Sequence, residues 1–275
     1  MLISIIITTK NEERNIKACL ESVLAQTYPK ENIEIIVVDN NSTDRTKEIV
    51  NEFGQRFSSL NLKVFNRGPE RSAQKNFGVR ESKGDYFLYL DADMRLSKNV
   101  ISECMAKVSQ DKEIIALYIP EKISGKGFWG KVRNFERSFY DGTVIDAVRF
   151  IQKEKFWEAG GFDERLYAGE DWDLDKRLKK LGKFDIIENP LYHNEEDFSL
   201  KKYLAKKAYY LGNIEIYISK WGKDDPDIKK QFGFYYRYLG VFFENGKWKK
   251  LLRHPILAGG VYFLRFLVGL QFLLS

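Results

Sequence analysis

Residues 85–96 have the sequence DYFLYLDADMRL, in which an apolar run ends in two carboxylates, Asp91 and Asp93. The run at 86–90 is continuous rather than alternating, which is typical of a strand buried on both faces of a parallel sheet. Open α/β sheets bind their ligands beyond the carboxyl ends of the strands. We therefore expect both acids at that edge, where they could bind a divalent cation. The alternative is a simple acidic turn.

Strand-like and helix-like patterns alternate over residues 1–115. Apolar or β-branched runs predict strands at 3–8, 33–39, 62–66 and 85–91. Helical spacing of apolar residues predicts helices at 12–26, 43–57 and 71–82. This alternation is typical of parallel strands joined by right-handed helical crossovers. The fold class is therefore α/β, with a Rossmann-like, mostly parallel sheet flanked by helices.

The chain beyond residue 115 divides into two parts. The first contains an expected strand at 113–120, a Gly-rich loop at 123–131, a helix at 170–182 and a strand at 186–193. From about residue 199 the sequence predicts a C-terminal helical extension rich in Lys, Tyr and Phe. Its last apolar segment, 256–274, has the length of a membrane-spanning helix but carries Arg265 near its middle. This segment could lie in a membrane interface, pair with a partner helix or dock on its own domain.

Composition restricts the compartment and the partners. The chain has 275 residues, a formal charge of +6 and two cysteines, too few for a disulfide framework. The N-terminus has no basic region before its short apolar stretch, so we expect a first strand, not a signal peptide, and a cytoplasmic catalytic part. The positive charge suits a nucleotide diphosphate or an acidic membrane surface. The basic residues are not interleaved with aromatic ones, so no nucleic-acid partner is expected.

The first predicted turn excludes two common classes of nucleotide-binding protein. It has the sequence TTKNEE, without glycine, so neither a dinucleotide fingerprint nor a phosphate-binding P-loop is available there. The second predicted strand ends in Asp39. A carboxylate at that place could accept hydrogen bonds from a nucleotide base or ribose, or could only shape the turn.

Several motifs together resemble family-two glycosyltransferases of the GT-A fold. They are IIITTKNEERNI (5–16), IIVVDNNSTDRT (35–46), ERSAQKNFGVRESKGDYFLYLDAD (70–93), GGFDERLYAGEDWDLDKRLKKLG (160–182) and His193. Each motif is weak alone, but the ordered set is specific. The resemblance implies a GT-A domain at 1–198, with a nucleotide-binding half at 1–115 and an acceptor half at 116–198. The extension at 199–275 is expected to associate with a membrane.

The resemblance also implies roles for individual residues on the donor side. The nucleotide-sugar would contact the first loop through Thr8, Lys10 and Glu12, and its base would contact Asp39. It would also contact Arg71 and Lys75 on the helix before the Asp-Ala-Asp, and Asp91 as the first acid of that motif. Asp93 would bind Mg²⁺ or Mn²⁺ directly, with His193 as a further ligand. Such a cation prefers oxygen ligands and shares the phosphates of the substrate. The alternatives are solvated basic residues at 71 and 75 and a hydrogen-bonded structural histidine.

On the acceptor side, the resemblance makes Asp171 the catalytic base, with Gly161, Glu170 and Trp172 lining the acceptor site. A carboxylate opposite the leaving diphosphate can take the proton of the acceptor hydroxyl, and direct displacement there inverts the anomeric configuration. The alternative is an acidic helix start that is stabilised by the helix dipole.

The expected function is metal-dependent, inverting transfer of a single sugar to a lipid-linked glycan or polyprenyl phosphate at the cytoplasmic face of the cell membrane. Many family members have two acids where this chain has Asp39 and Asn40, so the preference for uracil over guanine is left open, with a UDP-sugar favoured over GDP-mannose. No Gln-x-x-Arg-Trp motif of processive synthases is evident. The competing functions are an inactive nucleotide-sugar-binding membrane scaffold and a sugar-phosphate nucleotidyltransferase, which usually needs a glycine-rich N-terminal loop.

Overall fold

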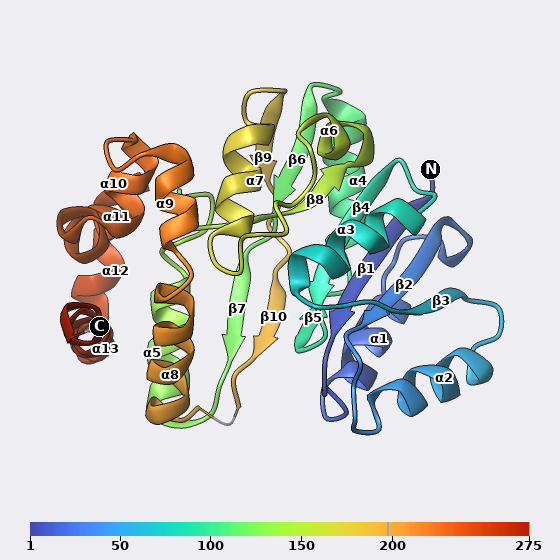
Figure 1. The fold of residues 1–275 in the computed structure, drawn as a ribbon, viewed down its shortest axis with the longest axis horizontal. Coiled ribbons are helices and arrows are strands. Elements are labelled where there is room, and N and C mark those ends of the chain that lie inside the picture. The colour runs from blue at the N-terminus through green and yellow to red at the C-terminus, as the bar shows by residue number, and fades with distance from the viewer. Residues whose placement is uncertain (197, 275) are drawn as a thin grey trace.

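The fold is built around a central twisted sheet with a small second sheet beside it. The computed structural model describes residues 1–196 and 198–274, and within them the large sheet has the strand order β3-β2-β1-β4-β8-β6-β9 (Figure 1). Its strands are β1 (Ile3–Thr9), β2 (Ile33–Asp39), β3 (Asn61–Asn66), β4 (Tyr86–Asp91), β6 (Ile114–Tyr118), β8 (Val148–Gln152) and β9 (Lys183–Ile186). The second sheet contains β5 (Met94–Leu96), β10 (Leu191–Asn194) and β7 (Glu121–Ser124), in that order.

The strands β1 to β4 pair in parallel, as the alternating pattern predicts. Ile3 of β1 lies opposite Ile33 of β2 and Tyr86 of β4. β8 is the exception, since it pairs antiparallel with both β4 and β6. Helices cover both faces of the sheet, with α1 (Ile16–Leu24), α2 (Thr46–Arg56) and α4 (Val100–Gln110) on one face and α3 (Arg71–Glu81), α6 (Lys153–Glu158) and α7 (Glu170–Leu178) on the other.

Successive side chains of β1 supply the two layers of the core. Ile5 and Ile7 pack with Cys19 and Leu20 of α1, whereas Ile6 packs with Val79 of α3 and with α7. All seven residues of β1 are buried, which explains why its sequence is rich in isoleucine and threonine and does not alternate between apolar and charged residues. The expected mostly parallel sheet flanked by helices is confirmed.

Two expectations about local structure are wrong. Residues 123–131 do not form a single Gly-rich loop, because they contain the end of β7 and the start of α5 (Gly127–Arg137). The glycines permit this change of direction: Gly127 has a φ of +66°, and a Cβ on Gly125 would lie 2.6 Å from the Cα of Gly130. The expected strand at 186–193 is two strands in different sheets, separated around Pro190, which has no N–H to donate.

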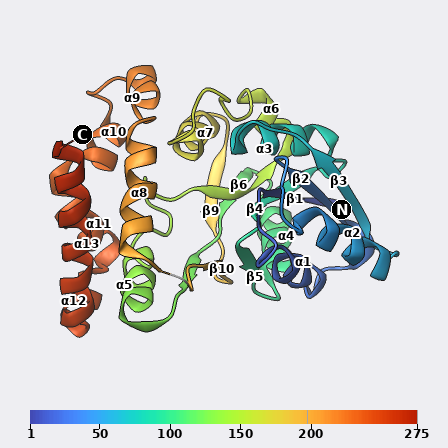
Figure 2. The ribbon, with the colours of Figure 1, turned by 60° about the horizontal axis from the view of Figure 1, so that its bottom comes forward.

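The C-terminal extension is helical, as expected, and packs on residues of the 116–198 segment. It contains α8 (Leu200–Leu211), α9 (Glu215–Trp221), α10 (Pro226–Phe232), α11 (Val241–Phe243), α12 (Trp248–Arg253) and α13 (Pro255–Leu274). In Figure 2, α8 and α13 lie beside α5, and the three helices share one apolar cluster. Arg265 of α13 is buried in this contact. Among the described residues, no helix combines the length and the apolarity that crossing a membrane requires.

Candidate active site

Polar side chains converge where β1, β2 and β4 end. Thr8 lies opposite Asp91 in the sheet, and its hydroxyl donates a hydrogen bond to Asp91 Oδ1 at 3.1 Å. Asp39 lies opposite Thr9 on the other side of β1. Because β1 stands between β2 and β4, the fold brings together three residues that the sequence predicts for the donor site.

The second sheet brings His193 to the Asp-Ala-Asp turn. β10 runs antiparallel to β5, so His193 lies opposite Met94, immediately after Asp93. The Nε2 atom of His193 lies 3.1 Å from Asp93 Oδ2, and its Nδ1 atom lies 3.0 Å from Glu121 Oε1. Burial would lower the pKa of His193, but hydrogen bonds to Asp93 and Glu121 outweigh it and raise the pKa to about 10. The ring is therefore a cation that donates to two carboxylates.

The chemistry of this pair fits a divalent cation. Asp93 Oδ1 is buried and has no hydrogen-bond partner among the described residues. A metal at Asp93 could take the place of the proton on His193 Nε2, while Glu121 would orient the ring through Nδ1, as carboxylates commonly do for metal-bound histidines. In the described part of the chain, no group of three or more His, Cys, Asp or Glu side chains could hold a metal ion. The protein would therefore supply two ligands and leave further positions to substrate phosphates and water.

Asp171 is the second residue of α7. Its Oδ1 atom accepts hydrogen bonds from Lys75 Nζ and from the hydroxyl of Tyr89, both at 3.1 Å. Burial would raise the pKa of Asp171, but the charges of Lys75, Arg149 and Arg71 outweigh it and lower the pKa. The carboxylate is ionised and 26% exposed, so it can accept a proton from an approaching group.

Lys75 is not a solvated surface residue. Its side chain is 2% exposed, and Nζ lies 4.6 Å from the ring centre of Tyr89 and 4.8 Å from that of Phe162. It also lies 3.6 Å from Glu170 Oε1, which Arg71 approaches to 3.4 Å. Lys75 therefore holds both acids of the Glu-Asp pair at the start of α7. The solvated alternative for this position is wrong, because the side chain is enclosed by rings and carboxylates.

The pKa values of Glu170 and Asp91 are shifted in opposite directions. Burial and the charge of Asp171 raise the pKa of Glu170. Burial would also raise the pKa of Asp91, but Lys75, Arg71 and Arg149 reverse this and lower it. Asp91 is therefore an anion inside a basic environment.

The remaining predicted donor-side residues lie around the first loop. Lys10 is exposed. Glu12 accepts a hydrogen bond from the amide of Asn15 at 2.7 Å, and its pKa is raised by burial and by the charges of Asp93 and Asp91, which places it near the Asp-Ala-Asp turn. Asp39 accepts hydrogen bonds from the backbone N–H and the hydroxyl of Ser42, so it shapes its own turn.

The predicted acceptor-side residues do not all face one space. Gly161, with a φ of +67°, is buried beside Asn76 of α3, where a Cβ would lie 3.0 Å from the amide oxygen. Trp172 donates from Nε1 to the carbonyl of Ile145, and its ring packs against Tyr217 and Phe232. Trp172 thus joins α7 to the extension, whereas Glu170 lies beside Asp171.

Sequence reasoning missed three residues of this site. Tyr89 could not be singled out because it is one of several aromatic and apolar residues of its strand. Glu121 could not be singled out because it belongs to no recognisable motif. Arg149 could have been found, since a charged residue within an apolar strand at 148–152 is unusual. Its side chain is buried, 5.3 Å from the Tyr89 ring centre and 3.4 Å from Glu121 Oε2. These three residues connect the Asp171 side of the site to the His193 side.

Comparison with known proteins shows the family to which this chain is similar. The family described as glycosyl transferase family 2 matches residues 4–163. Glycosyltransferase AglE of Haloferax volcanii is 40% identical over 240 residues, which cover 84% of this chain and 77% of that protein. The Methanococcus voltae dolichyl N-acetyl-alpha-D-glucosaminyl phosphate 3-beta-D-2,3-diacetamido-2,3-dideoxy-beta-D-glucuronosyltransferase is 27% identical over 237 residues, covering 76% of this chain and 71% of that protein.

A solved structure supports the fold. It is the mannosyltransferase PcManGT from Pyrobaculum calidifontis in complex with GDP-Man and Mn²⁺, with a TM-score of 0.66, 19% identity and coverage of 98% of this chain and 83% of that one. At this identity the likeness concerns the GT-A fold alone. The family match spans more than half of the chain, and the Haloferax relative covers most of it. The chain therefore belongs to glycosyl transferase family 2 and is a transferase with the GT-A fold.

Proposed function

We propose that this glycosyltransferase moves one sugar from a nucleoside diphosphate sugar to a hydroxyl group of a lipid-linked acceptor, with inversion at the anomeric carbon. The observation that carries the proposal is the arrangement around Asp91. The charges of Lys75 and His193 both lower the pKa of Asp91. His193 pairs with Asp93, and Lys75 holds Asp171. A cation-binding pair and an ionised base in one site are what displacement of a diphosphate by a hydroxyl requires.

In the proposed reaction, Asp171 acts as the general base. The acceptor oxygen forms a bond to the anomeric carbon, and the bond from that carbon to the diphosphate oxygen breaks, with the electron pair leaving on the nucleoside diphosphate. The hydroxyl proton passes to the carboxylate of Asp171. Lys75 and Tyr89 fix the position of this carboxylate through hydrogen bonds to Oδ1, which leaves Oδ2 free to face the hydroxyl.

Asp93 and His193 are the proposed ligands of Mg²⁺ or Mn²⁺, which when bound would offset the charge that develops on the leaving diphosphate. Asp91, Thr8, Lys10, Glu12 and Asp39 would contact the nucleotide. Arg71 would supply a second positive charge near the same edge. It would approach the phosphates while keeping its contact with Glu170. A UDP-sugar is favoured over GDP-mannose, although Asp39 and Asn40 by themselves leave the preference for uracil over guanine open.

The name of one relative supports the proposed acceptor class. The name of the Methanococcus relative specifies a dolichyl phosphate-linked sugar as its acceptor. We propose a lipid-linked glycan or polyprenyl phosphate for this chain as well, met at the anionic surface on the cytoplasmic face of the membrane. A basic, aromatic extension suits that location.

Release of UDP or GDP from a panel of nucleotide sugars, with Mn²⁺ and a lipid-linked acceptor, tests the catalytic proposal. Replacing Asp171 by Asn should keep the fold but lower the rate by about 10²–10⁴-fold, as expected for loss of a general base. Asp224→Asn, at a fully exposed carboxylate of the extension, is the matched control and should retain the rate. Full activity of Asp171→Asn, or no nucleotide release with any donor, would contradict the proposal.

A further inference from the structure

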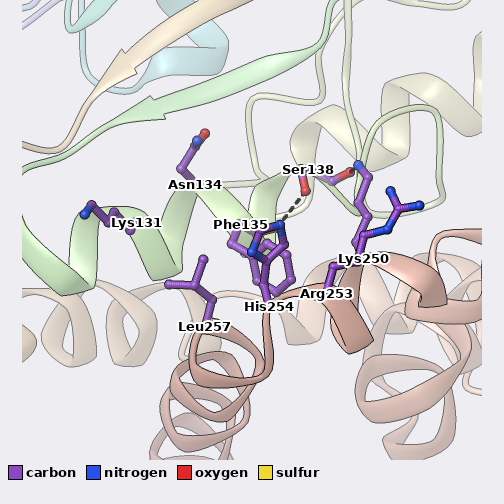
Figure 3. Close-up of a pocket in the computed structure, with 8 residues that line it drawn as sticks. All are labelled: Lys131, Asn134, Phe135, Ser138, Lys250, Arg253, His254 and Leu257. Carbon is purple, nitrogen blue, oxygen red and sulfur yellow. Dashed lines mark hydrogen bonds between the residues drawn. The ribbon is translucent and has the colours of Figure 1, made fainter.

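A basic groove lies between α5 and the junction of α12 with α13, away from the Asp-Ala-Asp turn. The groove has a volume of about 430 Å³, which is in the range of small-molecule sites. Its floor is apolar, formed by Phe135 and Leu257, and Figure 3 shows Lys131 on one side of Phe135 and Lys250 with Arg253 on the other. His254 completes the groove. None of the described residues that line it is a carboxylate.

The cations of this groove are available to a ligand. Lys131 and Arg253 are exposed, and within the described chain neither side chain has a hydrogen-bond or ion-pair partner. Lys250 donates a long hydrogen bond to the carbonyl of Ser138, at 3.4 Å, and its Nζ lies 5.6 Å from the ring centre of Phe139. By contrast, Lys247 on the preceding turn donates to the carbonyls of Phe139 and Asp141 and is used within the fold. The groove therefore concentrates uncompensated positive charge over an apolar floor.

An exposed apolar stripe lies on the same helices. On α13, Ile256, Phe263 and Phe266 are 75%, 46% and 57% exposed, and Leu252 at the end of α12 is 72% exposed. A Cβ placed on Gly259, between them, would meet nothing within 4 Å. The opposite side of α13, with Val261 and Leu264, is fully buried against the acceptor half. One face of α13 thus holds the helix on the protein. The other face is largely exposed, although the ring of Phe263 stacks on Trp129 of α5 with 5.8 Å between the ring centres.

We infer that the groove and the stripe form one surface that docks on an anionic lipid bilayer. The stripe would enter the boundary between headgroups and acyl chains, and the groove would receive a lipid phosphate between Lys131 and Arg253. The inference rests on the proposed function, since a lipid-linked acceptor has to be met at a membrane. A second copy of this chain fits less well, because a two-fold contact would place the same uncompensated cations against each other.

Binding of the full chain to lipid vesicles, without nucleotide or metal, tests this surface independently of catalysis. The chain should co-sediment with phosphatidylcholine vesicles that contain phosphatidylglycerol, and much less with pure phosphatidylcholine. Lys131→Gln with Arg253→Gln should weaken binding by about twentyfold to thirtyfold, since each cation near an anionic surface contributes about fivefold. Lys98→Gln with Lys112→Gln, at two exposed lysines of the nucleotide half, is the matched control and should bind as wild type.

The stripe has its own variant. Ile256→Glu with Phe266→Glu should reduce binding even to vesicles rich in phosphatidylglycerol, and because both side chains are exposed, the melting temperature should hold. Equal vesicle binding by the wild type and the Lys131/Arg253 variant would overturn the inference. So would a wild-type dimer, seen by light scattering, that the stripe variant dissociates. Loss of nucleotide release alone would affect the proposed function and leave this result standing.

Discussion

Asp175 lies one helical turn after Asp171, but its environment reverses its titration. Its Oδ2 atom accepts from the hydroxyl of Tyr118 at 2.9 Å, and its Oδ1 atom accepts from the backbone N–H of Val148 at 3.3 Å. Burial is the largest influence and raises the pKa of Asp175 from 3.8 to about 8, although Lys179 and these hydrogen bonds oppose it. The buried carboxyl group is therefore neutral in the folded protein below that pH.

Between pH 3.8 and about pH 8, Asp175 is protonated in the folded state and ionised in the unfolded state. The free energy of unfolding therefore falls as pH rises through this window. Asp175→Asn removes the titration, and the amide can still accept from Val148 and donate to the oxygen of Tyr118. The variant should gain stability relative to the wild type from about pH 4 to pH 8, by up to about 1.4 kcal/mol per pH unit. Urea unfolding at several pH values measures this difference.

Asp185 provides a control of opposite sign. Burial would raise its pKa, but its hydrogen bond to Lys107 at 2.5 Å contributes to lowering it. The stability of the wild type relative to Asp185→Asn should therefore increase as pH rises toward the unfolded pKa and stay constant above it. If Asp175→Asn and wild type kept a constant difference over the whole window, Asp175 would be ionised in the fold.

The sequence predicts individual residues of the site only where they belong to a recognisable motif. Asp91 and Asp93 follow a buried strand, so their place at the sheet edge could be derived from the sequence. The partner of Lys75 could not, because Asp171 is 96 positions away and the contact depends on how α7 packs against α3. Glu121 likewise meets His193 only through the pairing of β7 with β10.

At the scale of elements, one buried ion pair joins the extension to the GT-A domain. Arg265 Nε on α13 lies 3.0 Å from Glu136 Oε1 on α5, and its Nη2 donates to the Tyr140 hydroxyl at 2.8 Å. The guanidinium also lies 4.4 Å from the ring centre of Phe242. The charge of Arg265, which in the sequence indicates against a membrane span, thus fixes α13 on the protein.

Removing one partner of this pair should destabilise the fold. Arg265→Met leaves Glu136 buried with Arg133 as its remaining cation, and breaking such a pair costs about 3–5 kcal/mol. The double variant Arg265→Met with Glu136→Gln should lose less stability than the sum of the two single variants, because the contact between these side chains can be lost only once. Urea unfolding of the two single variants and the double variant measures the coupling.

The exposed pair of Lys17 and Glu21 on α1 is the control, and Lys17→Met should change stability little. Strictly additive losses from Arg265→Met and Glu136→Gln would show that the two side chains do not interact. The helix α5 that carries Glu136 was itself missed in the sequence, because three glycines hid the helical spacing of Val132 and Phe135 that faces α13. Glycine indicates a loop unless tertiary packing decides otherwise.

At the scale of the molecule, residues 1–115 and residues 116–198 both contribute to the site. Asp93 comes from the turn between β4 and β5, His193 from β10 and Asp171 from α7, so residues far apart in the sequence depend on both sheets for their positions. The parallel pairing of the nucleotide half followed from its alternating pattern. The second sheet did not, because its short strands β5, β7 and β10 carry too few residues for a clear period.

A ligand that engages the donor site should therefore stabilise the whole fold. UDP or GDP with Mn²⁺ should raise the melting temperature, since a ligand at a hundredfold excess over its dissociation constant adds about 2.7 kcal/mol. Chelation of the metal should remove most of this shift, because the diphosphate would then face the carboxylates of Asp91 and Asp93 without a cation between them. Asp93→Asn and His193→Gln should each reduce the Mn²⁺-dependent part, whereas Asp171→Asn should keep it. An equal shift with and without Mn²⁺, or none with either nucleotide, would refute the assignment of Asp93 and His193 to a metal-coupled donor site.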